Sequence, residues 1–218
     1  AAYRKDARSI EPLINRTYAY LDRFGSAIVP SSEKIRMEAE QVSDRRSLLR
    51  YAERVLLTLS DHHAITGSSL ADSWAVVPSY SDLWVVENDG IYTVDAVRST
   101  SPAQDAGIRQ GDRIVSVDDI PIERGVAAFW ADLGLPVTSG RAAFAAGVLV
   151  AGRRDRPRHI GMQSEGAVRF LELPNLYSTP REERPPVTVE EQQGNLTIRI
   201  NDTLGDTATI AAFDAAMA

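Results

Sequence analysis

The sequence predicts an α+β protein in which an N-terminal helical segment precedes a small, strand-rich domain. Apolar residues recur at helical spacing through the first sixty residues, and from about Trp74 they alternate as they do in strands. Between two predicted strands, residues 101–107 carry the start and stop signals of a short helix. These three observations together favour the α+β class.

Composition limits the classes of protein to which the chain can belong. Its 218 residues are enough for one large domain or two small ones with a substantial core. The net charge of −6 argues against a nucleic-acid partner. No apolar run approaches the ~20 residues of a membrane helix, so we predict no membrane span. The absence of cysteine excludes disulfides, thiol catalysis and cysteine-bound zinc.

Two apolar stripes and one polar segment predict helices in the first sixty residues. The first stripe is Ile10, Leu13, Ile14, Tyr18 and Leu21, and the second is Leu48, Leu49, Ala52, Val55, Leu56 and Leu59. Between them, residues 33–42 follow Pro30-Ser31-Ser32 and predict a shorter polar helix. One apolar face on each segment indicates a small bundle, or a hairpin packed against a partner.

The middle of the chain predicts a hairpin, a short helix and a strand. Residues 84–87 and 91–97 flank Asn88-Asp89-Gly90, which contains the Asp-Gly signal of a tight hairpin turn. Ser101 is suited to cap a helix that has Pro102 at its first position, and Gly107 is suited to the left-handed conformation that ends it. A Gly-Asp turn then leads into a strand at 113–117.

The second half of the chain predicts a further helix, two strands, a linker and a last strand–helix pair. Residues 125–133 predict the helix, and 143–150 and 158–162 predict a closing pair of strands around a solvated basic turn at Arg153-Arg-Asp-Arg156 and Arg158. Contact with an acidic partner or an anionic membrane surface is the alternative role of this basic cluster. The charged, proline-rich stretch 179–186 predicts an exposed linker. After it, residues 195–200 alternate as in a strand, and 207–218 have helical spacing.

One stretch carries a family resemblance. Ser101-Pro-Ala-Gln-Asp-Ala-Gly-Ile108, followed by Gly111-Asp112-Arg-Ile-Val-Ser-Val117, resembles the middle of a bacterial PDZ domain. The flanks are similar to those of C-terminal processing (tail-specific) serine peptidases. Leu59-Ser-Asp61-His62-His63 resembles the segment before that family's PDZ module, and Asn195-Leu-Thr-Ile-Arg-Ile-Asn201 with Phe213-Asp-Ala-Ala216 resembles the first strand and helix of its protease core.

The resemblance implies four regions. They are an N-terminal helical region at 1–66, a PDZ-like small β-barrel or sandwich with two helices at 67–178, a linker at 179–194, and the incomplete start of a protease core at 195–218. The family uses a Ser–Lys dyad, in which a desolvated neutral lysine takes the serine proton. Lys5 and Lys34 are the only lysines, and both precede the PDZ-like region. We therefore assign no catalytic residue and expect no hydrolysis by this chain alone.

The PDZ resemblance also implies a peptide groove, in which a substrate tail adds as a strand along a sheet edge. The edge corresponds to Ser81, Asp82, Leu83, Trp84, Val85 and Val86, and the opposite wall to Val126, Phe129 and Trp130. The family's carboxylate-binding loop carries glycines where this chain has Asp82 and Trp84, and Asp82 places a negative charge where a carboxylate would arrive. Two alternatives remain: a working groove, or a module that only packs against and spaces the protease core.

Two functional classes follow from these observations. The first is the N-terminal and PDZ portion of a C-terminal processing-type serine endopeptidase that binds protein or peptide C-terminal tails. The second is a non-catalytic PDZ-like peptide-binding or scaffold protein. Neither class needs a cofactor, and adjacent histidines such as His62 and His63 point in different directions, which disfavours a metal site.

A homodimer through the N-terminal helices or the last helix is a further partner that the sequence allows. The chain opens Ala-Ala-Tyr without an initiator Met. A removed signal peptide or a cut upstream explains this start equally well, and with the resemblance it predicts a periplasmic or otherwise exported protein.

Overall fold

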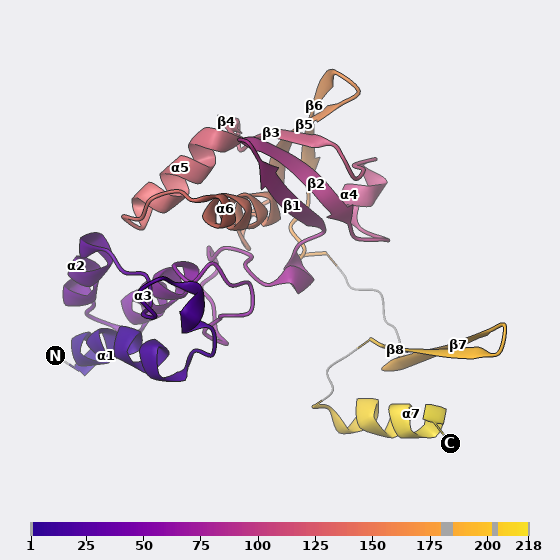
Figure 1. The fold of residues 1–218 in the computed structure, drawn as a ribbon, viewed down its shortest axis with the longest axis horizontal. Helices are drawn as coiled ribbons and strands as arrows, with labels where there is room; N and C mark the ends of the chain where they lie inside the picture. The colour runs from indigo at the N-terminus through magenta and orange to yellow at the C-terminus, as the bar shows by residue number, and fades with distance from the viewer. Residues whose placement is uncertain (1, 180–184, 202–204, 218) are drawn as a thin grey trace. The chain divides into compact units, whose positions relative to one another are not determined.

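A computed structural model describes residues 2–179, 185–201 and 205–217. The chain is an α+β protein, as predicted, and it divides into two compact units, Ala1–Thr179 and Pro180–Ala218. The first unit holds the N-terminal helices and an antiparallel sheet with its own helices (Figure 1). The N-terminal helices and the sheet domain thus share one unit.

The N-terminal region forms three helices that pack on one another: α1 (Ala2–Thr17), α2 (Glu33–Gln41) and α3 (Arg45–Leu57). A 3₁₀ turn, η1 (Leu21–Arg23), follows α1. Ser32 caps α2 by accepting a hydrogen bond from the Ile35 amide, and Asp44 caps α3 in the same way through the Ser47 amide. The helices predicted around residues 10–21, 33–42 and 48–59 are therefore confirmed.

The sheet has the order β1-β2-β3-β5-β6, with a short strand β4 attached to β3. Its strands are β1 (Leu83–Asn88), β2 (Ile91–Val97), β3 (Arg113–Val117), β4 (Ile120–Pro121), β5 (Arg158–Ser164) and β6 (Ala167–Leu173). All pairings are antiparallel, and β1 lies at one edge. The predicted hairpin at 84–97 and the strands at 113–117 and 158–162 are confirmed.

The capped helix between β2 and β3 also forms. Helix α4 (Pro102–Asp105) begins after Ser101, whose hydroxyl accepts a hydrogen bond from the Gln104 amide at 3.3 Å. Gly107 follows with φ +73°, the left-handed conformation that glycine adopts without steric cost. Ile108 then buries its side chain, and its amide donates to the Ala103 carbonyl.

One predicted strand is wrong. Residues 143–150 lie inside helix α6 (Ser139–Ala151), which packs along β1, while α5 (Ile122–Asp132) packs against β3 and β4. The sheet domain therefore has three helices in the part of the chain that the structure describes. The predicted basic turn is also wrong, because residues 152–157 connect a helix to a strand and Arg158 is fully buried.

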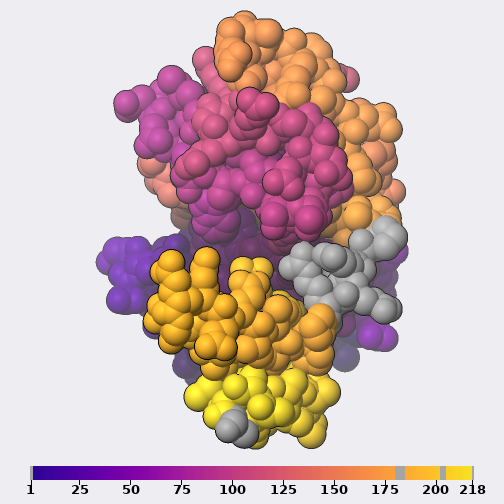
Figure 2. All heavy atoms as spheres, turned by 90° about the vertical axis from the view of Figure 1, so that its right-hand side faces the viewer, coloured from indigo at the N-terminus to yellow at the C-terminus, as the bar shows by residue number. Residues whose placement is uncertain are grey.

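The second unit consists of a hairpin, β7 (Val187–Gln192) with β8 (Asn195–Ile200), and a helix, α7 (Thr207–Met217). Helix α7 packs along the hairpin (Figure 2). The second half of the predicted linker thus contains a strand, and residues 180–184 of that linker lie outside the described residues. Several apolar side chains of this unit are exposed: Val189, Leu196, Ile200, Ile210 and Met217.

Across the described residues, we find no helix with both the length and the apolar character that crossing a membrane requires.

Candidate functional site

A cavity of about 410 Å³ lies between the edge strand β1 and helix α6. We call it the β1–α6 groove. Its walls come from β1 and the start of that strand, from α6, from the end of β2 and from the segment between α3 and β1. The lining residues are Ser60, His62, Ala75, Val76, Pro78, Ser81, Asp82, Leu83, Trp84, Val85, Ala96, Val97, Arg98, Gly140, Ala143, Phe144 and Gly147.

The first predicted wall of the groove is in place. Leu83 and Val85 bury their side chains, whereas Trp84 points outward and is 49% exposed. Ser81 precedes the strand, and its hydroxyl donates to the Leu83 carbonyl at 2.9 Å. Val86 is half-buried in the same strand. Because β1 is an edge strand, its backbone groups on the side away from β2 have no partner strand in the sheet.

The second predicted wall is different. Val126, Phe129 and Trp130 belong to α5, where they are buried in the core, and they are not among the residues that line the groove. Trp130 is fully enclosed, and its indole N–H donates to the Arg141 carbonyl at 2.8 Å. Helix α6 takes the place expected for α5, since Phe144 and Gly147 face the groove.

Asp82 does not present a free negative charge to the groove. Its carboxylate forms a two-pronged ion pair with Arg158, at 2.6 Å and 3.1 Å, and neither side chain is exposed to solvent. The Ala103 amide donates to the same carboxylate at 3.0 Å. The repulsion of an incoming carboxylate that the sequence suggested is therefore largely cancelled by the buried guanidinium.

A positive charge lies at the same end of the groove. The guanidinium of Arg98 donates to the carbonyls of Pro78 and Ser79, at 2.6 Å and 2.9 Å, in the 3₁₀ turn η2 (Pro78–Tyr80) that precedes β1. The Arg98 amide donates to the Asp82 carbonyl at 2.8 Å. Because Arg158 balances the charge of Asp82, that carboxylate adds no net negative charge at the start of β1.

An imidazole ring lines part of the groove. His62 packs against Phe144 with ring centroids 4.7 Å apart and against Trp84 at 5.8 Å. Its Nδ1–H donates to the Val76 carbonyl at 2.7 Å. Burial lowers the pKa of His62 below its usual value, with a smaller opposing effect from the Val76 carbonyl. The ring is therefore mainly neutral above about pH 6.5.

The other residues of the Asp61-His62-His63 motif have structural contacts. Asp61 accepts hydrogen bonds from the Tyr18 hydroxyl at 2.7 Å and from the His63 amide at 2.8 Å, which ties helix α1 to the end of α3. Burial and the bond to Asp61 raise the pKa of Tyr18 to about 12. Within the described ranges, no group of three potential metal ligands comes together.

The two lysines lie far from any arrangement suited to proton abstraction. Lys34 on α2 is exposed and forms an ion pair with Asp132 at 3.2 Å. Lys5 lies on the exposed surface of α1. Neither lysine is desolvated as a neutral general base requires.

Comparison with known proteins identifies one domain. A family model for the PDZ domain matches residues 93–129, which run from β2 through α4 and β3 into α5. This part of the chain is similar to the PDZ domain, in agreement with the resemblance seen in the sequence. Strand β1 and helix α6, which form the groove, lie outside the matched stretch.

No curated protein sequence matches the chain. Among solved structures, it is similar to the photosystem II D1 C-terminal processing protease, with 17% identity and a TM-score of 0.38. The alignment covers 87% of this chain and 47% of that one, so the chain spans about half the length of that protein.

Proposed function

We propose that this chain is the N-terminal and PDZ portion of a C-terminal processing-type serine peptidase, and that its PDZ domain binds the C-terminal tail of a protein substrate. The matched PDZ stretch at 93–129 supports the domain assignment. The sequence resemblance of the segments around Asp61 and Asn195 supports the peptidase assignment. An exported location belongs to the same proposal and is tested by cell fractionation.

The observation that carries the proposal is an edge strand with a cavity beside it. A substrate tail entering the β1–α6 groove adds to β1 as a further strand and satisfies its unpaired backbone groups. The last side chain of the tail then packs between Leu83 and Phe144, which both line the groove. Its carboxylate lies toward Arg98 at the start of β1, where the buried Asp82–Arg158 pair leaves no net negative charge.

Binding requires His62 to leave its present position. The ring occupies space between Trp84 and Phe144 that a tail needs, so the tail and the imidazole compete. The affinity measured for a tail therefore includes the free energy of displacing the ring.

In this proposal the chain positions the substrate and does not itself catalyse hydrolysis. Lys34 is ion-paired and Lys5 is exposed, so no described lysine is placed to activate a serine. A fluorogenic peptide assay with the purified chain is expected to show no turnover above background.

A titration of matched peptides tests the groove. We expect a peptide with an apolar last residue and a free carboxylate to bind at least about tenfold more tightly than its amidated form, because the amide loses a charge-assisted contact. Ala143 lines the groove, so Ala143→Phe should abolish binding, whereas Ala127→Phe on the exposed face of α5 should not. Equal affinity for both peptides contradicts capture of the carboxylate.

A further inference from the structure

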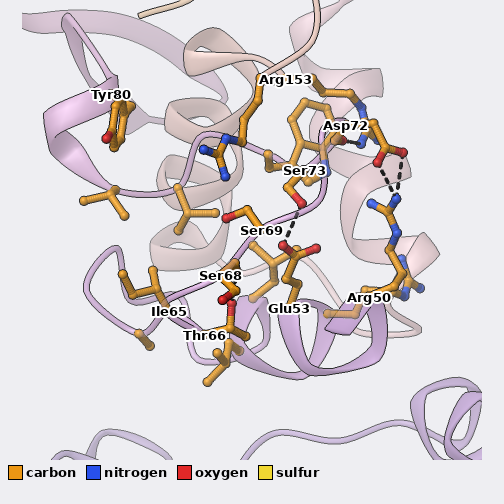
Figure 3. A pocket seen from close by; sticks show the side chains of 18 of the residues that line it. Arg50, Glu53, Ile65, Thr66, Ser68, Ser69, Asp72, Ser73, Tyr80 and Arg153 are labelled. Atoms are coloured by element: carbon orange, nitrogen blue, oxygen red, sulfur yellow. Dashed lines mark hydrogen bonds and ion pairs between the residues drawn. The ribbon is translucent and has the colours of Figure 1, made fainter. Parts of the chain in front are cut away.

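A second and larger cavity, of about 1020 Å³, lies between the N-terminal helices and the sheet domain within the first unit. We call it the arginine cavity. Its lining comes from α3, from the segment at 64–80 and from the loop after α6 (Figure 3), together with Asp132 at the end of α5 and Tyr177. Its size suits a short peptide or a small organic ligand. This cavity is separate from the β1–α6 groove.

The lining carries more positive than negative charge. Five arginines and three carboxylates contribute to it. The carboxylates are already engaged: Asp72 is paired with Arg50 at 2.6 Å, Asp132 with Arg54, and Glu53 accepts a hydrogen bond from the Ser73 hydroxyl at 2.6 Å.

Two of the arginines, Arg153 and Arg154, contact aromatic rings in place of carboxylates. Within the described parts of the chain, no carboxylate pairs with either guanidinium. The guanidinium of Arg153 lies over the Trp74 ring, 4.0 Å from its centroid, and donates to the Asp72 carbonyl. The guanidinium of Arg154 lies over the Tyr177 ring at 3.9 Å.

The backbone fixes both arginines in place. Trp74 and Arg153 form an antiparallel bridge, and the Arg154 amide donates to the Ser73 carbonyl at 3.1 Å. The Ala75 amide donates to the Gly152 carbonyl at 2.9 Å, which extends this pairing. A guanidinium that rests on an aromatic face keeps its edge N–H groups available for an anion. The site is therefore pre-organised and does not depend on flexible surface side chains.

Electrostatics points in the same direction. Arg153 is half-buried, and burial, followed by the nearby charges of Arg156 and Arg50, lowers its pKa from the ordinary value. A buried cation in a positive surrounding gains from an anionic partner.

We propose that the arginine cavity binds a ligand through its carboxylates, with Arg153 and Arg154 as the receiving groups. Planar carboxylates match the paired N–H edge of each guanidinium. The hydroxyls of Ser68 and Ser69 lie near the centre of the pocket and supply neutral hydrogen-bonding groups for the rest of the ligand (Figure 3). An acidic peptide segment and a small polycarboxylate share this chemistry.

Calorimetric titration of the full chain at low salt tests the proposal. The probes are acetyl-Asp-Glu-Asp-amide, its neutral analogue acetyl-Asn-Gln-Asn-amide, citrate and inorganic phosphate. Both peptides have a blocked C-terminus, so neither offers the free chain end that the β1–α6 groove is proposed to bind. A negative result at the arginine cavity therefore leaves the proposed function untouched. We expect the acidic peptide or citrate to bind and the neutral peptide not to bind. Binding of either carboxylate probe supports the proposal. If only one of them binds, the result shows whether the cavity prefers an acidic peptide or a small polycarboxylate.

Variants locate the binding. Arg154→Gln should weaken binding about tenfold or more, because a charge-assisted contact is lost, and Arg124→Gln on the exposed surface of α5 should change it little. If Arg154→Gln fails to fold, ¹H–¹⁵N spectra of the side-chain Nε–H groups in the unaltered chain provide the second readout. The proposal is overturned if phosphate alone binds, if no probe binds, if both variants lose affinity equally, or if the Arg153 and Arg154 signals do not shift.

Discussion

Replacing Arg158 by methionine removes the guanidinium that neutralises Asp82 in the core. Arg158 forms two ion-pair contacts with Asp82 and donates to the carbonyls of Pro174 at 3.0 Å and Val150 at 3.3 Å. In Arg158→Met the carboxylate keeps only the Ala103 amide as a partner and stays buried with its charge unpaired. The change therefore removes the charge balance at the start of β1 without changing the strand itself.

The magnitude follows from the burial of the pair. Both side chains are 0% exposed, so solvent does not screen them. Breaking a buried pair by removing one partner costs about 3–5 kcal/mol. For a chain of this size each kcal/mol lowers the midpoint of thermal unfolding by about 2–4 °C, so we expect a decrease of roughly 6–20 °C.

Circular dichroism during thermal and urea unfolding measures the change, and a double-mutant cycle identifies its cause. Asp82→Asn keeps an acceptor for the Ala103 amide but has no charge. The double variant should therefore be more stable than Arg158→Met alone. A loss below about 1 kcal/mol in Arg158→Met, or strictly additive effects in the double variant, would refute the assignment of Asp82 as a neutralised structural residue.

Three further results are expected. His62→Ala should tighten binding of a free-acid tail about fivefold in calorimetry, because ring contacts of about 1 kcal/mol no longer oppose the tail; unchanged or weaker binding would contradict the competition. Since burial lowers the pKa of folded His62, the unfolded chain takes up the proton first. This contribution to stability is thus complete above about pH 6.5 and is lost as the pH falls below it. Urea midpoints of the unaltered chain should decrease more steeply from pH 7 to 5.5 than those of His62→Phe. The same pH dependence in both proteins would contradict the lowered pKa of His62. Gly152→Ala should lower the free energy of urea unfolding by more than about 2 kcal/mol, because φ is +77° and the new Cβ would lie 2.7 Å from Arg158 Cγ. Gly140→Ala is the control, because nothing lies within 4 Å of its new Cβ, and it should change this free energy little. Equal losses in the two variants would contradict a steric cause at Gly152.

The elements that the sequence predicted correctly are those with local signals. The hairpin at 84–97 has an Asp-Gly turn in which both residues have positive φ, and α4 has a hydroxyl cap, a proline and a closing glycine. Strands β6 and β7 were missed although each adjoins an X-Gly turn of the same kind, Glu165-Gly166 and Gln193-Gly194. Treating any X-Gly pair between apolar alternations as a hairpin turn would have found both.

Helix α6 was misread because it is buried almost all round. Eight of its residues, including Phe144 and Leu149, are in the core, so its apolar pattern has no helical period. Because α6 was predicted as a strand, the second wall of the groove was assigned to α5. The pairing of Asp82 with Arg158 joins residues 76 positions apart, and no local pattern indicates such a contact. The same holds for His62, whose motif showed only the end of a helix while its ring lies in the groove.

The most direct measurement of the central claim is the map of amide chemical-shift changes when an unlabelled free-acid peptide is added to the ¹⁵N-labelled chain. We expect the largest changes in β1, from Leu83 to Val86, and on the groove side of α6 near Phe144. The amidated peptide should produce much smaller changes at the same concentration. Changes confined to other surfaces, or identical maps for the two peptides, would contradict tail binding at the β1–α6 groove.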